Sequence, residues 1–307
     1  MKKSDSIYDL KGTLTANATL GSDSWFRCGG TADLLFSPSD FEDLAAFLKS
    51  NTAPITILGG MANTIIRDGG VLGTVIRLGK GCANIEALDN NQIKAEAGAL
   101  NGSIAAAALK NNIGSLEFLS GIPGTLGGAV KMNAGAYGAE MRNVLVEVHL
   151  MDRDGNIHIK TPDELGMSYR HTNINEDMIV IAAILKGQAD TYEAVKTHLT
   201  EIKKKRNDTQ PIKEKTGGST FANPSAEELK AAGLPETMRA WEIVDKVGGR
   251  GLTIGGAQMS EKHCNFMINT GSATATDLES LGDELIRRAQ EQLGIALHWE
   301  IKRIGEK

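Results

Sequence analysis

The stretch that decides the fold is residues 120–138, SGIPGTLGGAVKMNAGAYG. Its many glycines permit left-handed backbone conformations, which can turn several N–H groups toward one point. Such a concavity, or a helix N-terminus near Thr125, binds a phosphate without a basic side chain. A tight structural turn against a neighbouring strand explains the glycines equally well. The stretch alone therefore leaves phosphate binding and a structural turn open.

A second glycine-rich loop, residues 59–63 (GGMAN), directly follows an apolar strand expected at residues 55–58. Two such loops would suit a dinucleotide, which carries two phosphates. No complete GxGxxG, GxxxxGK[ST] or GxSxG occurs in the sequence. A Rossmann fold, a P-loop and an α/β-hydrolase therefore lack their main sequence support.

The rest of the chain mixes strands and helices without regular alternation, so we predict the class α+β. The strands that apolar runs and alternation predict are at residues 32–36, 55–58, 75–78, 92–97, 144–151, 157–160, 178–185, 266–268 and 298–303. The predicted helices are at residues 39–50, 103–111, 192–206, 226–232, 237–247 and 277–293.

Three local patterns sharpen these predictions. Ser39 and Glu42 have capping-box spacing at the start of the first helix. Asp154-Gly155 between two alternating runs indicates a β-hairpin. The run 209–211 (TQP) breaks the helical pattern and predicts a domain boundary. The expected domains are residues 1–80, 81–208 and 209–307.

Composition excludes several classes of function. With 41% hydrophobic and 23% charged residues, the chain is an ordinary globular protein. Its net charge of −5 disfavours nucleic acid as a partner. The basic run 203–206 is read either as a solvated helix end or as a contact to an anionic substrate. The histidines lack the spacing of metal ligands, so no metal is expected.

The cysteine pattern and the hydropathy of the sequence predict the cellular compartment of the protein. Cys28, Cys82 and Cys264 are odd in number and form no CxxC, which is typical of a reducing compartment without disulfides. The first residues, MKKSDSIYDLKG, lack the apolar region of a signal peptide, and no run of about 18 apolar residues occurs. We therefore expect a cytoplasmic protein without a membrane partner.

Six motifs, taken together, resemble one family. They are LGGMAN at 58–63, SGIPGTLGG at 120–128, MNAGAYG at 132–138, YR at 169–170, GSTFANP at 218–224 and HWE at 298–300. In this order they are similar to the UDP-N-acetylenolpyruvoylglucosamine reductases, over nearly the whole chain. One departure is that Met61-Ala62 stands where the family often has Gly-Ser. Main-chain contacts would survive this change, whereas a side-chain hydroxyl contact to the phosphates would not.

The resemblance implies a two-part FAD-binding region of the vanillyl-alcohol-oxidase/PCMH type, followed by a C-terminal α+β substrate domain. It implies that NADPH reduces FAD and leaves, and that a hydride then passes from flavin N5 to the enolpyruvyl methylene carbon of UDP-N-acetylglucosamine enolpyruvate. The product is UDP-N-acetylmuramate, a peptidoglycan precursor, and a monomer is expected. The implied cofactor-binding residues are Gly59, Gly60, Met61, Ala62, Asn63, Ser120, Gly121, Ile122, Gly124, Thr125, Gly128, Asn133, Gly135, Gly138 and Val180.

Three residues carry the implied catalysis. Hydride addition leaves negative charge on the adjacent carbon and its carboxylate, and the Arg170 guanidinium could grip that carboxylate. Ser219 matches the family's proton donor, and Glu300 could orient Arg170 or help polarise the substrate carboxylate. Without the family match, Arg170 would be read as an ion-pair residue, Ser219 as a turn serine and Glu300 as a solvated strand carboxylate. Strand alternation over 298–303 puts His298, Glu300 and Lys302 on one face.

The diphosphate of the substrate needs cationic or amide donors. The candidates by motif position are Arg206, Asn223, Lys262 and His263. One type of this family carries a tyrosine-bearing loop that covers the substrate. Here the link from the strand at 178–185 to the next helix is short and carries only Tyr192, so we assign the chain to the type that lacks this loop.

Two other readings stay open. One is a flavin oxidase or dehydrogenase of the same flavin-binding architecture that acts on an alcohol or a hydroxy acid. The other is a flavin- or nucleotide-binding sensor without catalysis, which would leave Arg170, Ser219 and Glu300 unexplained. The compound that bleaches the flavin under anaerobic conditions distinguishes the enzymes.

Overall fold

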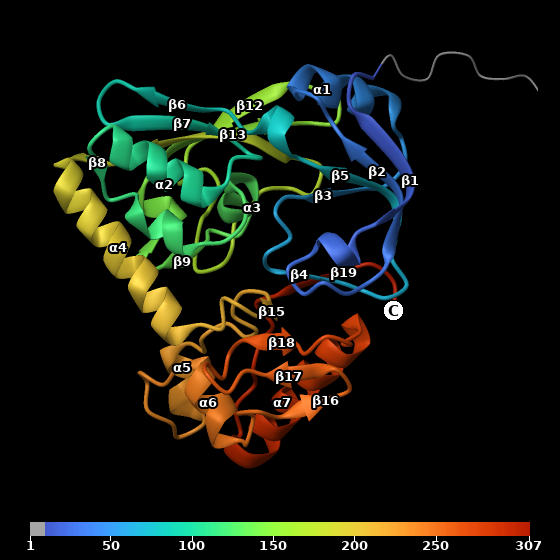
Figure 1. Cartoon of the computed structure of the whole chain (residues 1–307), viewed down its shortest axis with the longest axis vertical. Coiled ribbons are helices and arrows are strands. Elements are labelled where there is room, and N and C mark those ends of the chain that lie inside the picture. Colours follow the sequence, from blue (N-terminus) through green and yellow to red (C-terminus); the bar gives the residue numbers. More distant parts are fainter. Residues whose placement is uncertain (1–9) are drawn as a thin grey trace, which may run out of the picture. The chain divides into compact units, whose positions relative to one another are not determined.

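The computed structural model describes residues 10–307, and Figure 1 labels most of its helices and strands. Most of the segment read for a signal peptide, residues 1–9, lies outside the described residues. Internal contacts divide the chain into two compact units. Among the described residues, unit 1 comprises residues 10–17, Asp33–Gly60 and Gly73–Lys205, and unit 2 comprises Ala18–Ala32, Met61–Leu72 and Arg206–Lys307.

Unit 1 contains a five-stranded antiparallel sheet in the order β12-β11-β13-β7-β6. Its strands are β6 (Ile85–Leu88), β7 (Gln92–Glu96), β11 (Leu145–Met151), β12 (Ile157–Lys160) and β13 (Ile179–Lys186). The predicted hairpin is confirmed, because Met151 faces Ile157 across a turn in which Gly155 has a φ of +80°. The backbone amides of Asp154 and Asn156 both donate to Asp152 Oδ1 and close this turn.

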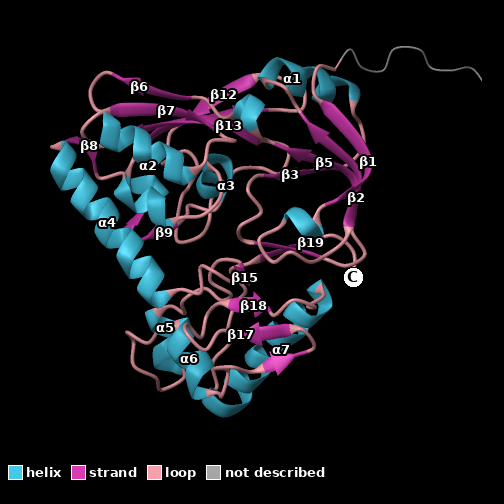
Figure 2. Cartoon of the chain, viewed as in Figure 1, coloured by secondary structure: helices cyan, strands magenta, loops and turns pink. Residues whose placement is uncertain are grey.

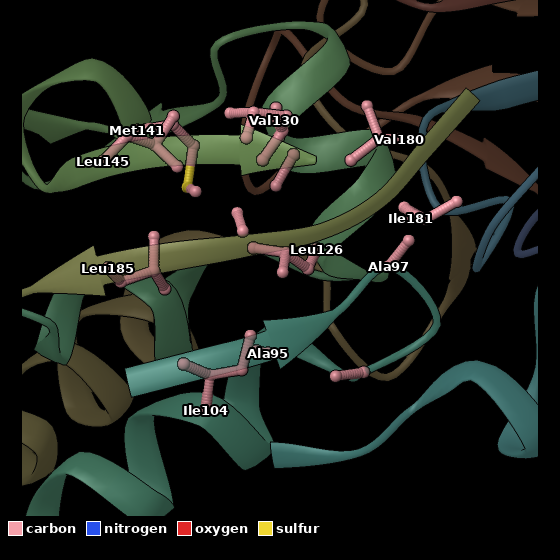
Figure 3. Packing of buried hydrophobic residues seen from close by; sticks show 14 of the residues in the cluster. Ala95, Ala97, Ile104, Leu126, Val130, Met141, Leu145, Val180, Ile181 and Leu185 are labelled. Carbon is pink, nitrogen blue, oxygen red and sulfur yellow. The ribbon is translucent and has the colours of Figure 1, made fainter. Parts of the chain in front are cut away.

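The core of unit 1 lies around β13 and two helices (Figures 2 and 3). These are α2 (Asn101–Lys110) and α3 (Leu126–Lys131), the latter beginning where the glycine-rich stretch predicted a helix. Figure 3 shows Leu126 and Val130 of α3 among the side chains of the sheet. Burying such aliphatic side chains stabilises the fold by about 1.5–3 kcal/mol each.

A second sheet, in the order β1-β2-β5-β3, includes the strands whose ends carry the chain from one unit to the other. The strands are β1 (Thr13–Thr19), β2 (Thr31–Ser37), β3 (Ile55–Leu58) and β5 (Val71–Arg77), with α1 (Phe41–Ser50) between β2 and β3. The capping box predicted at Ser39 is wrong. Asp40 caps α1 by accepting from Asp43 N, and the Ser39 hydroxyl, which the prediction used as the cap, instead donates to Asp40 Oδ2.

Short elements complete unit 1. They are the pair β8 (Ile113–Gly114) and β14 (Gln188–Ala189), the pair β9 (Gly135–Ala136) and β10 (Ala139–Glu140), and the 3-10 helices Lys80–Cys82, Glu117–Gly121 and Met141–Asn143. Helix α4 (Tyr192–Thr209) begins shortly after β14 and its last residues belong to unit 2, so the link that was expected to be short is short. In the part of the chain that the structure describes, no helix is apolar and long enough to cross a membrane.

Unit 2 is built on the sheet β15-β18-β17-β16. Its elements are β15 (Lys215–Thr216), β16 (Thr253–Ile254), β17 (Ala257–Met259), β18 (Met267–Asn269), α5 (Ala226–Ala231), α6 (Ala240–Lys246), α7 (Ala275–Leu293) and the 3-10 helix Gly21–Asp23. A further parallel pair joins β4 (Thr64–Ile66) to β19 (Lys302–Ile304). Helix α7 buries Leu278, Leu281 and Leu285 in the core of this unit and ends at Gly294, whose φ is +66°.

The predicted strand at 298–303 is wrong for residues 298–301 and right for residues 302–303. Only Lys302–Ile304 forms a strand, β19, and Trp299 makes an isolated bridge to Phe221. The backbone of residues 298–300 pairs with residues 220–222 and then bends at Ile301 toward β4. The alternation argument, which placed His298, Glu300 and Lys302 on one strand face, therefore fails.

Candidate functional site

Unit 1 contains a cavity of about 340 Å³ between β3, β13 and the start of α3. Four of the predicted cofactor residues line it: Gly59, Thr125, Gly128 and Val180. Its other lining residues are Ile55, Thr56, Ile57, Leu58, Leu78, Ala97, Gly127, Lys131, Glu176, Met178 and Ile179. An apolar cleft with a few polar groups is typical of a small-molecule or cofactor site.

The glycines of the two predicted loops bring their backbones together. A Cβ on Gly59 would lie 2.2 Å from Thr125 Oγ1, and one on Gly60 would lie 2.8 Å from Gly124 Cα. Gly128 differs, because a Cβ there would meet nothing within 4 Å although the residue lines the cavity. The protein itself would thus tolerate a side chain at Gly128, and the glycine keeps the cavity open.

Thr125 supplies a polar group that the fold leaves unsatisfied. Its hydroxyl is buried, and among residues 10–307 it has no hydrogen-bond partner. A buried polar atom of this kind is costly unless a ligand or water bonds to it. The amides of Leu126 and Gly127 donate to Ala99 O and Ala97 O, so these two N–H groups of the helix start already serve the fold. Cavity, glycines and hydroxyl together fit part of a dinucleotide cofactor.

Arg170 lies at the tip of a tight turn in unit 1, residues 168–171, here called the Arg170 turn. Ser168 and His171 exchange two backbone hydrogen bonds, and Arg170 has a φ of +55°. This left-handed conformation is strained for a residue with a side chain and is common at functional sites. The guanidinium donates to Gly135 O at 3.0 Å and stacks over the Tyr169 ring at 4.8 Å. These two contacts hold the guanidinium in one orientation.

Asn133, predicted to bind the cofactor, is fully buried in unit 1. Its Nδ2 donates to Ser168 O at 2.8 Å, and its Oδ1 accepts from Arg142 N at 3.0 Å. The side chain therefore holds the Arg170 turn. Any contact of residue 133 with a cofactor would have to come from its main chain, and it stays a prediction.

The remaining predicted cofactor residues of unit 1 do not line the cavity. Ser120 Oγ donates to Glu117 O, and Gly121 lies against the Tyr137 ring, where a Cβ would be 2.2 Å from Cε2. Ile122 O accepts from Asn101 Nδ2. Gly138 has a φ of +85°, and Gly135 belongs to β9. These residues shape the loop around the Arg170 turn and α2.

Ser219 and Glu300 come together within unit 2. We call residues 219–222 the Ser219 segment. Glu300 N donates to Thr220 O at 2.8 Å, and Ala222 N donates to His298 O at 2.9 Å. Thr220 is completely buried, and its hydroxyl has no partner within the described residues. The predicted proton donor therefore sits next to the backbone of the predicted carboxylate.

Asn63 joins this cluster. Its Nδ2 donates to Glu300 O at 3.1 Å, and its O accepts from Lys302 N at 3.0 Å. A Cβ on Gly218 would lie 2.7 Å from Asn63 Oδ1, so a side chain there would force the Asn63 amide to shift. Met61 and Ala62 are buried, and Met61 has a φ of +47°. The position at which the family often has glycine is thus one whose backbone suits glycine.

The four predicted substrate residues all lie in unit 2. Lys262 lines a cavity of about 530 Å³ beside residues 207–214, and its Nζ donates to Asn207 O. Arg206 Nε donates to Gln210 Oε1 at 3.3 Å. Asn223 Oδ1 accepts from Ala240 N at the start of α6. His263 packs edge-on against Phe266, and burial lowers the pKa of its imidazole.

Sequence patterns missed some residues around these sites. Lys131, Glu176 and Met178 line the cavity of unit 1 but were not among the predicted cofactor residues, although Lys131 lies within the stretch 120–138. Asn265 makes three hydrogen bonds to the Ser219 segment and carries no sequence signal of its own, because its partners are distant in the chain.

Comparisons with known proteins agree with the fold and the cavity. The family model of an FAD binding domain matches residues 32–160. The model described as the C-terminal domain of UDP-N-acetylenolpyruvoylglucosamine reductase matches residues 210–304. The chain is an FAD-dependent oxidoreductase, and the α+β class with its FAD-binding region is confirmed.

Relatives along the full length make the assignment specific. A UDP-N-acetylenolpyruvoylglucosamine reductase of Maricaulis maris is 48% identical over 96% of this chain and 93% of the relative. One of Gluconobacter oxydans is 46% identical over 98% and 95%, respectively. The crystal structure of the enzyme from Thermus caldophilus aligns with a TM-score of 0.78 at 32% identity, covering 95% of this chain and 99% of that one. The chain belongs to the UDP-N-acetylenolpyruvoylglucosamine reductase family, which decides against the oxidase and sensor readings.

Proposed function

We propose that this chain reduces UDP-N-acetylglucosamine enolpyruvate to UDP-N-acetylmuramate with electrons from NADPH, as a cytoplasmic monomer without nucleic-acid or membrane partners. The observation that carries the proposal is the pairing of the Ser219 segment with residues 298–300, which joins a hydroxyl donor to a carboxylate segment. The net charge of −5 agrees with a small-molecule substrate in place of nucleic acid.

FAD, when bound, supplies the hydride that the enolpyruvyl methylene carbon receives. Gly59, Gly60, Gly124 and Thr125 would hold it through main-chain amides and the buried Thr125 hydroxyl. Gly128, which has no side chain, would leave room for the cofactor, and Val180, which also lines the cavity, would cover it. The other predicted contacts, at residues 61–63 and within 120–138, belong to the same proposal.

Arg170 binds the carboxylate of the enolpyruvyl group. Negative charge flows into this carboxylate when hydride adds to the methylene carbon, so a fixed cation lowers the barrier. A guanidinium suits the task because it is planar, stays charged and can bond both carboxylate oxygens. The hydrogen bond to Gly135 O and the stacking on Tyr169 hold it in one orientation before substrate arrives, which avoids reorganisation during the reaction.

Ser219 then donates its hydroxyl proton to the carbon that bears the negative charge. A serine hydroxyl is a weak acid, but a carbanion-like carbon is more basic still, and such acid catalysis contributes about 10²–10⁴-fold. Glu300 helps to polarise the substrate carboxylate. Together, these steps add one hydride and one proton across the double bond.

Arg206, Asn223, Lys262 and His263 bind the UDP part of the substrate. The cavity beside Lys262 supports a role for this lysine with an anionic group. His263 serves as a hydrogen-bonding group and not as a cation, since burial lowers the pKa of its imidazole.

The experiment is an anaerobic stopped-flow measurement on the purified flavoprotein. NADPH should bleach the flavin absorbance, and UDP-N-acetylglucosamine enolpyruvate should restore it with formation of UDP-N-acetylmuramate. A protein that cannot be loaded with FAD, or a reduced flavin that this substrate does not reoxidise, would overturn the proposal.

A further inference from the structure

One buried side chain outside the assigned residues binds the Ser219 segment on both of its polar groups. Asn265 is 5% exposed. Its Oδ1 accepts from Phe221 N at 2.9 Å, and its Nδ2 donates to Phe221 O at 2.8 Å. Its main-chain carbonyl accepts from Thr220 N at 2.7 Å. Asn265 thus makes the hydrogen bonds that a neighbouring strand would make.

The opposite edge of the segment is bonded to residues 298–300. Thr220 O accepts from Glu300 N, and Ala222 N donates to His298 O. Residues 220–222 are therefore held from both sides. Gly217 and Gly218 precede Ser219, and glycine is the least restrained residue. The position of the Ser219 hydroxyl consequently depends on the anchoring that follows it in the chain.

We propose that Asn265 is a positioning residue for the proton transfer: its amide fixes the main chain of Phe221, and through it the Ser219 hydroxyl. The inference rests on the proposed role of Ser219. The chemistry requires an amide, because one side chain must accept from an N–H and donate to a carbonyl at the same residue. Aspartate could only accept, and its charge would lie against Phe221 O.

Asn269, four residues further along the chain at the end of β18, offers a matched comparison. It is 4% exposed, its Nδ2 donates to Phe26 O, and its Oδ1 accepts from Gly271 N and Ala273 N. The two asparagines share burial and bonding pattern, but none of these Asn269 bonds goes to the Ser219 segment. An effect confined to Asn265 therefore reports on positioning, and an effect common to both reports on stability.

The test measures the two half-reactions of the FAD-loaded enzyme by anaerobic stopped flow. Asn265→Asp should slow reoxidation by UDP-N-acetylglucosamine enolpyruvate by about 10²-fold, as a displacement near 1 Å does. Flavin reduction by NADPH should stay within about twofold of wild type, because no proton from Ser219 enters that step. Asn265→Gln keeps both polar groups on a longer stem and should have the same selective effect, which keeps the test decisive if the aspartate variant does not fold.

A double-mutant cycle with Ser219→Ala identifies the route of the effect. If Asn265 acts through Ser219, Asn265→Asp should slow reoxidation by less than about threefold in the Ser219→Ala background. Asn269→Asp should give equal factors in both backgrounds. Equal factors for Asn265→Asp, or equal loss in both half-reactions, would overturn the inference. If wild-type reduced flavin is not reoxidised by the substrate, the proposed function fails and not the role of Asn265.

Discussion

The Arg170 turn and the Ser219 segment each hold a functional side chain in place, but through different sets of hydrogen bonds. In each, a buried asparagine bonds to the main chain beside the functional side chain: Asn133 to Ser168, and Asn265 to Phe221. The Arg170 turn is otherwise closed by its own hydrogen bonds between Ser168 and His171. The Ser219 segment has no such local closure and bonds to residues far along the chain.

The difference shows which interactions fix the position of each functional side chain. A local turn fixes Arg170 at the expense of a left-handed backbone, which costs about 1–2 kcal/mol for a residue other than glycine. The Ser219 segment carries no positive φ and takes its position from tertiary partners. We therefore expect changes at Ser219 to act on one chemical step, and changes at Arg170 to leave the turn itself intact.

The largest effect on flavin reoxidation is expected when the proposed proton donor, Ser219, is removed. Ser219→Ala removes the proton donor and should slow reoxidation of reduced flavin by substrate about 10²–10⁴-fold. Flavin reduction by NADPH should continue at the wild-type rate. Stopped-flow traces of the two half-reactions provide the measurement. Equal loss of both steps would contradict the assignment of Ser219 as proton donor.

The next effect concerns the cation. Arg170→Lys keeps the charge but removes the planar, two-point grip on a carboxylate. Loss of such a stabiliser costs about 3–4 kcal/mol of transition-state stabilisation, or about 10²–10³-fold in turnover. Lysine imposes the same left-handed strain, so thermal unfolding should change little. Turnover equal to that of wild type would refute the proposed clamp.

Several features of both regions could be predicted from local sequence. The hairpin around Asp154-Gly155 and strand β3 were found because turn chemistry and apolar runs are local signals. The start of α3 at Thr125 was found for the same reason. The helix cap is Asp40 and not Ser39 because both side chains precede the helix and are able to accept from its first N–H groups, and a spacing rule cannot rank the two.

Non-local pairing explains what the sequence could not reveal. Residues 298–301 alternate like a strand, yet their backbone pairs with residues 220–222 and the strand begins only at Lys302. Asn265 has no motif, because its role exists only once Phe221 is beside it. Asn133 sits in a cofactor-like motif, but its side chain bonds inside the fold. Family resemblance supplied the catalytic candidates, and geometry assigned the supporting residues.

A variant that fills the cofactor cavity of unit 1 can separate an effect on FAD binding from an effect on protein stability. Gly128→Leu should fill the cavity and weaken FAD binding by about tenfold or more, since overpacking costs about 1–3 kcal/mol. Gly102→Leu in α2 is the matched control, because a Cβ there also meets nothing within 4 Å and the residue does not line the cavity. Flavin absorbance per protein and titration of the apoprotein with FAD measure the difference. Equal FAD affinity in both variants would show that Gly128 does not face the cofactor.

The smallest effect is a pH dependence near the Ser219 segment. Burial, with a minor contribution from Arg250, lowers the pKa of His263 below its usual 6.5 in the folded protein. The unfolded chain therefore binds a proton first as the pH falls, so stability is complete above about pH 6.5 and declines as the pH drops from there through the folded pKa.

His263→Gln should flatten this decline in the free energy of unfolding. Trp241→Phe, which places a smaller ring beside His263 and so reduces its burial, should bring the pKa back toward 6.5 and make the decline shallower. An unchanged slope in His263→Gln would mean that another group drives the acid sensitivity, and the imidazole would then be available as a cation for the substrate diphosphate.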